Sequence, residues 1–222
     1  MAGHAAGRGG HPADRHALGI RALIRHFDRL LCRANGVFEF SAHQDNVLRL
    51  QWGTAPHPLH LSDGVEVRAG DPAVITHLWN EHVPPMGPDG PDLAWAARIG
   101  RMLLASYRAA AMWLADQPRM AGVRAVGGVT VLIAPSGHGG SMRLMQRLGF
   151  EVLPYRHPLG RFGEFWENLY TWWLMWAYNA ASLRNRRLLR LRRTEIWMSA
   201  RAFLEKWAAI RSASGTLSDS SW

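Results

Sequence analysis

The sequence predicts one α/β domain built on a mixed, mostly antiparallel sheet with flanking helices, followed by a C-terminal pair of amphipathic helices. Short alternating apolar segments come first along the chain, and a strand-helix-strand order comes later. The 222 residues are 48% hydrophobic, which is enough to bury a sizeable core. We expect the domain to span residues 16–157 and the helical pair 158–211, with disordered tails at 1–15 and 212–222.

The first expected element is an amphipathic helix from Ala17 to Arg33. Its apolar residues recur at spacings of three, four and seven, which is the pattern of one helix face. Three arginines, Arg21, Arg25 and Arg29, lie on the opposite face. The pair Asn35-Gly36 is a good stop signal for the C-terminal end of this helix.

Extended segments follow the helix. Residues 37–40 and 47–52 alternate with period two around a polar turn, so they predict a hairpin. Two shorter extended pieces, 59–61 and 65–67, are divided by a Ser-Asp-Gly turn. The next expected strand runs from Ala73 to His82.

The longest helical pattern in the body runs from residue 91 or 92 to residue 116. It starts with a proline and an aspartate, and both suit the first turn of a helix and the positive end of its dipole. A buried strand is expected within 123–134. A short helix at 141–148 then ends at Gly149, and the last expected strand is 150–153.

Basic residues are concentrated towards the C-terminus. The chain has a formal net charge of +9, and residues 156–211 contain 11 basic residues against 4 acidic ones. A nearly balanced body with a basic end points to an anionic surface, either lipid headgroups or nucleic acid. The single cysteine, Cys32, excludes an intrachain disulfide, and we expect it to be an inert thiol in a reducing compartment. The N-terminus has no apolar run of the kind found in a signal peptide.

The element order and the step Leu148-Gly149-Phe150 resemble the second half of the GNAT acyltransferase fold. In that family, a loop with an arginine and closely spaced glycines cradles the pyrophosphate of coenzyme A. The corresponding loop here, 86–92, contains two prolines that lack an amide hydrogen, and Asp89 and Asp92 would repel phosphate. The cofactor therefore stays unknown: an acyl donor either enters differently or is not coenzyme A.

A second resemblance covers roughly residues 70–157. Its motifs are Gly70-Asp71-Pro72, His77-Leu78-Trp79-Asn80-Glu81 followed by Pro84, Leu93-Ala94-Trp95, Gly128-Val129-Thr130 and Leu148-Gly149-Phe150. This combination resembles the YkoP-like domain family, whose members occur alone or fused to polysaccharide deacetylase domains. The resemblance implies an envelope or glycan context without naming a reaction.

Polar groups capable of chemistry crowd the end of the strand that follows the hairpins. Glu81 or His82 can serve there as general base for an amine or hydroxyl acceptor, and His60 can join them. His77 and Asn80 are ligand-binding candidates. Alternatively, Asn80 and Glu81 hold the adjacent loop by hydrogen bonds to its backbone. The spacing His-x-x-x-Glu-His does not match the zinc-protease pattern, so we expect no metal site.

A glycine-rich segment before the short helix is a second candidate site. Its residues are Gly137, His138, Gly139 and Gly140, with Arg143 three residues further on. Glycines expose several backbone amides at the start of a helix, so this segment can bind an anion. A plain surface loop is the alternative.

The C-terminal quarter contains four tryptophans and two tyrosines between Phe165 and Leu183. Polar residues interrupt this segment, which favours a helix lying at the headgroup boundary over one that spans the membrane. The membrane-binding candidates are Trp166, Trp172, Trp173, Trp176, Arg184, Arg186, Arg187, Arg190 and Trp197. Aromatic rings followed by cations suit a helix pair lying on an anionic membrane. The alternatives are tryptophans packed against the sheet or a second subunit, and single-stranded nucleic acid, for which no binding signature is present.

Two functional hypotheses follow. In the first, the chain is an acyltransferase-related protein of envelope lipid or glycan metabolism, peripheral on the cytoplasmic face of the cell membrane. In the second, it is a non-catalytic, membrane-associated adaptor that binds an envelope-modifying enzyme. The proline-containing loop favours the adaptor over a normal coenzyme A enzyme, and whether the chain is an enzyme stays open.

Overall fold

The computed structural model describes residues 12–130, 140–155, 157, 159–183, 188, 191 and 193–208. The α-helices are α1 (Pro12–Ala34), α2 (Leu93–Ala115), α3 (Gly140–Arg147), α4 (Gly160–Asn179) and α5 (Ala200–Trp207), and the 3-10 helices are η1 (Pro118–Gly122) and η2 (Ala180–Leu183). The strands are β1 (Val37–Phe38), β2 (Leu48–Thr54), β3 (Leu59–His60), β4 (Glu66–Val67), β5 (Pro72–Leu78), β6 (Ala125–Thr130), β7 (Glu151–Pro154) and β8 (Thr194–Ser199).

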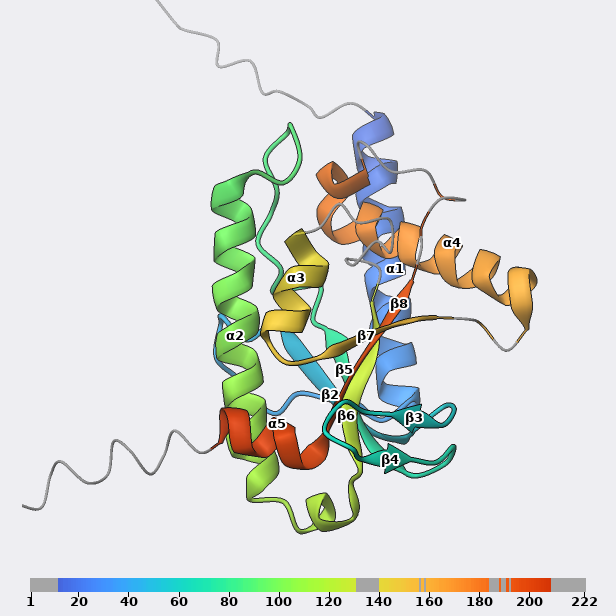
Figure 1. Ribbon diagram of the computed structural model, residues 1–222. Helices are drawn as coiled ribbons and strands as arrows, with labels where there is room; N and C mark the ends of the chain where they lie inside the picture. The colour runs from blue at the N-terminus through green and yellow to red at the C-terminus, as the bar shows by residue number, and fades with distance from the viewer. Residues whose placement is uncertain are drawn as a thin grey trace, which may run out of the picture.

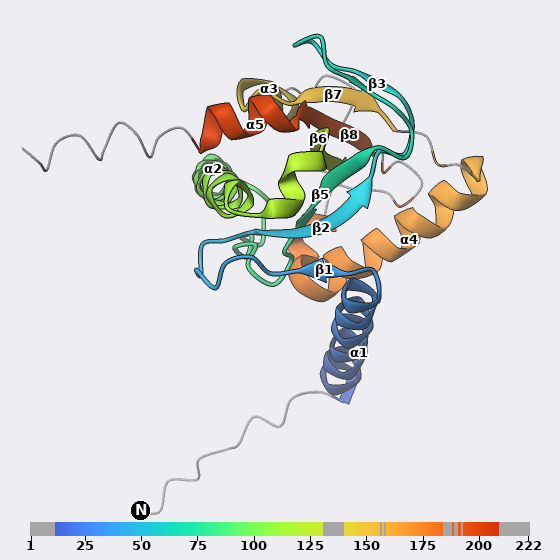
Figure 2. The ribbon, with the colours of Figure 1, turned by 90° about the horizontal axis from the view of Figure 1, so that it is seen from below.

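Six strands form one sheet in the order β1-β2-β5-β6-β8-β7. Figure 1 labels β2, β5, β6, β7 and β8 of this sheet, and Figure 2 also labels β1. Among the described strand pairs of this sheet, β5 and β6 are parallel and the others are antiparallel. Strands β3 and β4 form a separate two-stranded sheet. The predicted mixed, mostly antiparallel sheet with flanking helices is confirmed. The GNAT-like strand order stays a prediction.

The sheet is covered on both faces. Helices α2 and α5 lie over one face, and α1 and α4 lie on the other side (Figure 2). Side chains alternate along β2, so Leu48 and Leu50 enter the main core beside α2, while Arg49 points the other way. On that second face, the β3–β4 sheet covers a smaller core around Trp197. Helices α1 and α4 lie over the remaining part of the second face.

Local signals explain the helix ends. Asp92 caps α2 because its carboxylate accepts a hydrogen bond from the backbone N–H of Trp95 at 2.6 Å. Gly36, just after α1, has φ +69°, and Gly149, just after α3, has φ +92°. Residues other than glycine rarely adopt these angles, so both glycines stop their helices as predicted.

The C-terminal segment differs from the expected helical pair. Residues 194–199 form β8 in the interior of the sheet, so the expected second helix is wrong there, and only the short helix α5 follows. The physical reason is that β8 is buried on both faces, Ile196 and Met198 in the main core and Trp197 in the smaller one. A strand covered on both faces is apolar without clear alternation and can be mistaken for a buried helix segment.

Helix α1 turns its arginine face inward. Arg25 donates to the carbonyl of Ala177 in α4, and Arg21 stacks 4.9 Å from the Trp176 ring centroid. The predicted amphipathic pattern is present, but much of its apolar side is exposed to solvent. This is the reverse of a usual surface helix, whose apolar face packs on the core.

None of the described helices is both long and apolar enough to cross a bilayer.

Candidate functional site

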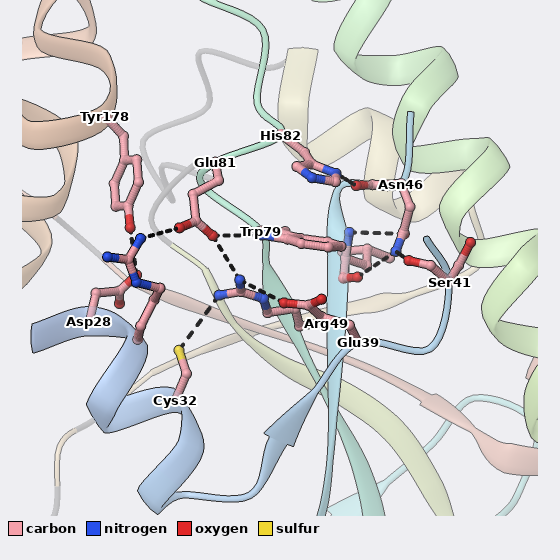
Figure 3. Close-up of polar contacts among 12 residues, drawn as sticks. Asp28, Cys32, Glu39, Ser41, Asn46, Arg49, Trp79, Glu81, His82 and Tyr178 are labelled. Atoms are coloured by element: carbon pink, nitrogen blue, oxygen red, sulfur yellow. Dashed lines mark hydrogen bonds and ion pairs between the residues drawn. The ribbon is translucent and has the colours of Figure 1, made fainter. Parts of the chain in front are cut away.

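Arg49 is the centre of a polar cluster where β2 meets the turn after β5. The register of the sheet places it opposite His77 of β5. Its side chain is 8% exposed, and Nη2 donates to Glu81 Oε2 at 2.7 Å and to Glu39 Oε1 at 3.0 Å. The guanidinium also lies 4.6 Å from the centroid of the Trp79 ring (Figure 3). A buried cation is thus held by two carboxylates and an indole.

Glu81, the expected general base, is a partner of this cation. Its carboxylate also accepts from Trp79 Nε1 at 2.8 Å and from Arg29 Nη1 at 3.5 Å. Partial burial acts to raise the pKa of Glu81, but the Trp79 hydrogen bond and the Arg49 charge outweigh it and hold the pKa below its usual range. A carboxylate stabilised in its ionised form is a weak base, so this geometry suits an anchor better than proton abstraction. Its catalytic role stays a prediction.

The two candidate histidines lie apart from each other. His82 Nδ1 donates to the carbonyl of Asn46 at 2.7 Å, and its ring stacks on Trp79 with 3.7 Å between centroids (Figure 3). His60 lies on β3 in the separate sheet, and its side chain is 80% exposed. The structure therefore brings His82 and Glu81 to one cluster and leaves His60 outside it.

A cavity of about 450 Å³ lies between α1, α4, the start of α2 and strands β2 and β5. Most of its wall is apolar, including Leu31, Ile99, Leu174 and Met175. Two predicted ligand-binding residues, His77 and Asn80, both line it, whereas the three catalytic candidates do not. Its volume falls within the range of small-molecule sites. This cavity is the candidate functional site.

His77 presents a neutral imidazole to the cavity. Burial, aided by the Arg49 charge, lowers the pKa of His77, so the ring is unprotonated at neutral pH. Gln51 fixes the tautomer, because its Nε2 donates to the carbonyl of Asn35 and its Oε1 is left to accept from His77 Nε2 at 2.8 Å. Nδ1 therefore carries a lone pair, and it has no hydrogen-bond donor among the described residues.

Asp28 supplies the buried anion of the cavity. It accepts hydrogen bonds from the hydroxyls of Tyr170 and Tyr178, both from α4. Burial and the nearby carboxylate raise the pKa of both tyrosines, so both hydroxyls stay protonated. The carboxylate joins the two helices that enclose the cavity.

Cys32 also lines the cavity as an uncharged thiol. Burial, together with the charge of Asp28, raises the pKa of Cys32. Its sulfur lies 3.9 Å from Arg49 Nη1. A thiol kept protonated is a poor nucleophile, which fits the inert role expected for it.

Arg193 closes the far side of the cavity, next to α4. Its Nη2 donates to Thr171 Oγ1 at 2.7 Å, and its Nε lies 3.3 Å from Glu167 Oε2. Burial lowers the pKa of Arg193, although Glu167 opposes this. The Tyr155 hydroxyl also donates to Glu167, and burial with the Glu167 charge raises the pKa of Tyr155 to about 12. This network fixes the start of β8 to α4.

The remaining predicted site residues either lie outside the described residues or lie on α3, α4 or β8. Gly137, His138, Gly139 and the arginines Arg184, Arg186, Arg187 and Arg190 lie outside the described residues, and Gly140 is the first residue of α3. Arg143 is exposed on α3. On α4, Trp166 and Trp173 are exposed and Trp172 and Trp176 are half-buried. Trp197 is 1% exposed, so its expected contact with a membrane is wrong, because β8 places it between the sheet and the β3–β4 hairpin.

Sequence reasoning missed Asp28, Arg49 and Arg193 as residues of the site. Asp28 follows Arg21 and Arg25 at spacings of seven and three, so the inward face of α1 was visible as a polar row. Arg49 is a charge between two leucines in an otherwise apolar strand. A buried charge of this kind must find a partner, which is a usable signal for a site. Arg193 lies in a run of arginines and carries no such signal.

The profile of the YkoP domain family matches residues 19–207, most of the chain. The chain belongs to the YkoP domain family. The match covers the sheet, its flanking helices and β8, so the C-terminal segment is included in the YkoP domain. No curated protein and no solved structure matches the chain.

Proposed function

We propose that this YkoP domain is a non-catalytic, ligand-binding adaptor of envelope lipid or glycan metabolism that acts at the membrane surface. The observation that carries the proposal is the cavity of about 450 Å³ between α1, α4 and the sheet. Its mostly apolar wall with a few polar groups is the common composition of a small-molecule site. The envelope context comes from the family resemblance, because some members of the family are fused to polysaccharide deacetylase domains.

Apart from His77, three ionisable groups in or beside the cavity are already committed to internal contacts or kept uncharged. Glu81 neutralises Arg49, Asp28 holds two tyrosine hydroxyls, and Cys32 stays protonated. Catalysis by these groups would require breaking contacts that stabilise the fold. Binding requires no such change, and this is why an adaptor is favoured over an enzyme.

The side chains that line the cavity indicate an amphiphilic ligand. Leu174, Met175 and Ile99 offer apolar surface for a hydrocarbon chain, while His77 Nδ1 can accept a hydrogen bond from a hydroxyl or amide group. Asn80, which also lines the cavity, can donate to a carbonyl oxygen. A lipid with an acyl chain and a hydroxyl- or amide-bearing head matches this combination.

Calorimetric titration with lauroyl-lysophosphatidylglycerol, lauric acid and lauroyl-coenzyme A tests the proposal. We expect the wild-type chain to bind at least one of these probes with heat and a raised melting temperature. Leu174→Trp fills part of the cavity and should abolish binding, whereas Leu93→Trp, on an exposed position of α2, should not. Binding of equal strength in both variants, or of none of the probes to the wild type, contradicts a ligand in this cavity.

An acyltransferase-related enzyme is the second candidate, and the state of His77 favours it. A neutral imidazole with an unshared Nδ1 lone pair is suited to act as a general base. In this alternative, His77 replaces Glu81 and His82 as the base. Transfer of the lauroyl group from lauroyl-coenzyme A to an amine or hydroxyl acceptor, lost in His77→Gln, would establish the enzyme in place of the adaptor.

The membrane placement is supported by α4. The side chains of Leu159, just before α4, and of Phe162, Trp166 and Trp173 along it are exposed. Indoles with a polar N–H prefer the headgroup boundary of a bilayer. The partner proposed for this helix is an anionic membrane surface, and an envelope-modifying enzyme is the proposed partner of the rest of the domain.

A further inference from the structure

We infer that the outer face of α1 is a second membrane-docking surface, which adjoins the exposed aromatic face of α4 and takes an anionic lipid bilayer as its partner. This inference deepens the membrane placement proposed above and rests on it. The sequence predicted a membrane contact at Trp197, which is buried. The inference assigns that contact to α1, near the other end of the chain.

The outer face of α1 consists of large apolar side chains that are exposed to solvent. Ile20, Leu23, Phe27 and Leu30 recur at spacings of three and four, so they form one stripe along the helix. Leu23 is 67% exposed, and all four are at least 48% exposed. The opposite side of α1, with Arg25 and Asp28, is the one that packs on α4. A stripe of this size is more than the scattered exposure of single residues.

The stripe continues onto α4. The rings of Phe27 and Tyr170 meet edge to face with 6.5 Å between centroids. Tyr170 lies between Trp166 and Trp173 on α4, four and three residues away respectively, so the three rings share one side of that helix. The two helices are in contact on the same side of the sheet (Figure 2). The apolar surface is therefore shared by two helices that both enclose the cavity.

Charge identifies the partner as an anionic bilayer. Between His16 and Ala34 the acidic residue of α1 is Asp28, which is buried, while Arg33 is exposed at the C-terminal end of the stripe, and the whole chain has a formal net charge of +9. Apolar side chains flanked by cations are what a helix lying in the headgroup region requires. A second copy of this chain docked through the same face would bring two chains of net charge +9 together, which disfavours a symmetric dimer.

The experiment is flotation of the full-length chain with two kinds of vesicle, one of equal parts phosphatidylglycerol and phosphatidylcholine and one of phosphatidylcholine alone. The test variant is Ile20→Gln with Leu23→Gln. Its matched control is Leu93→Gln with Met112→Gln, which removes the same kind of exposed side chain from α2. Glutamine keeps the charge unchanged. Thermal melting establishes that both variants are folded.

We expect the wild type and the α2 control to float with the anionic vesicles, and the α1 variant to bind them at least about tenfold more weakly. Unchanged binding of a folded α1 variant overturns the inference, as does equal wild-type binding to both vesicle types. A wild-type dimer in sedimentation that becomes monomeric in the α1 variant overturns it too, in favour of self-association. Leu174→Trp should still float, so loss of ligand binding in the cavity and loss of docking on α1 are separate results.

Discussion

The Tyr170 hydroxyl of α4 donates a 2.6 Å hydrogen bond to the Asp28 carboxylate of α1. Tyr178 donates to the other carboxylate oxygen at 3.2 Å, and Asp28 is only 5% exposed. One buried anion therefore joins the two helices that enclose the cavity. Hydrogen bonds to a charged acceptor are stronger than those between neutral groups, so this joint helps to hold α1 on the domain.

Asp28→Asn should weaken this joint. The amide is neutral and presents a donor to one of the two tyrosine hydroxyls, so we expect a loss of about 1–3 kcal/mol in the free energy of unfolding. Thermal melting should show a decrease of several degrees. Asp45→Asn, at an exposed turn, is the control and should melt like the wild type. Equal melting temperatures of both variants would mean that the hydrogen bonds of the two tyrosines do not depend on the charge of the Asp28 carboxylate.

Glu81→Gln should destabilise the protein at neutral pH by about 1–3 kcal/mol, because buried Arg49 loses its nearer carboxylate. The pKa of Glu81 is lowered in the folded state from its ordinary 4.5. The stabilisation by the charged form is thus fully present above pH 4.5 and is lost as the pH falls through the folded pKa. Chemical denaturation of the wild type and of Glu81→Gln between pH 7 and pH 3 measures this pH-dependent stabilisation.

The difference in stability between wild type and Glu81→Gln should shrink as the solution is acidified. A difference that stays constant down to pH 3 would show that the carboxylate charge is not what Arg49 requires. Retention of full biological function by a folded Glu81→Gln protein would remove the catalytic role predicted for Glu81.

His77→Gln should reduce the sensitivity of the protein to mild acid. The pKa of His77 is lowered in the folded state, so below pH 6.5 the unfolded chain binds a proton that the folded chain does not. The wild type therefore loses stability as the pH falls from 6.5 towards the folded pKa. Denaturation curves between pH 7.5 and pH 5 should show a shallower loss for His77→Gln. A wild-type slope in His77→Gln would contradict the lowered pKa.

Gly127→Ala should disrupt the centre of the sheet. A methyl group at this position overlaps the backbone carbonyl of Ile196 and the ring of Trp197, both in β8. Overpacking against backbone cannot be relieved by a rotamer change, so we expect a loss of about 3 kcal/mol or more. Gly122→Ala meets no atom within 4 Å and is the control. Wild-type stability of Gly127→Ala, measured by chemical denaturation, would contradict the place of β8 beside β6.

Local features of the sequence predicted much of the scaffold. The hairpin of β1 and β2, the long helix α2 and the stop of α3 at Gly149 depend on residues within a few positions of each other. The end of the expected strand 73–82 was also identified as the place where polar groups gather, and His77 and Asn80 do line the cavity. Side-chain alternation and capping act over one or two turns of chain, and this is why they can be recognised without tertiary structure.

The sequence by itself determined the fold class, the family resemblance and the stretch that carries the polar groups. Only the tertiary structure decided three other matters: the arginine face of α1 turns inward, β8 lies inside the sheet, and Glu81 is held by Arg49. Each depends on a partner 32 to 152 residues away or on a strand covered on both faces. Periodicity shows that a helix or strand has two faces, but which face is buried depends on what distant segments bring to it.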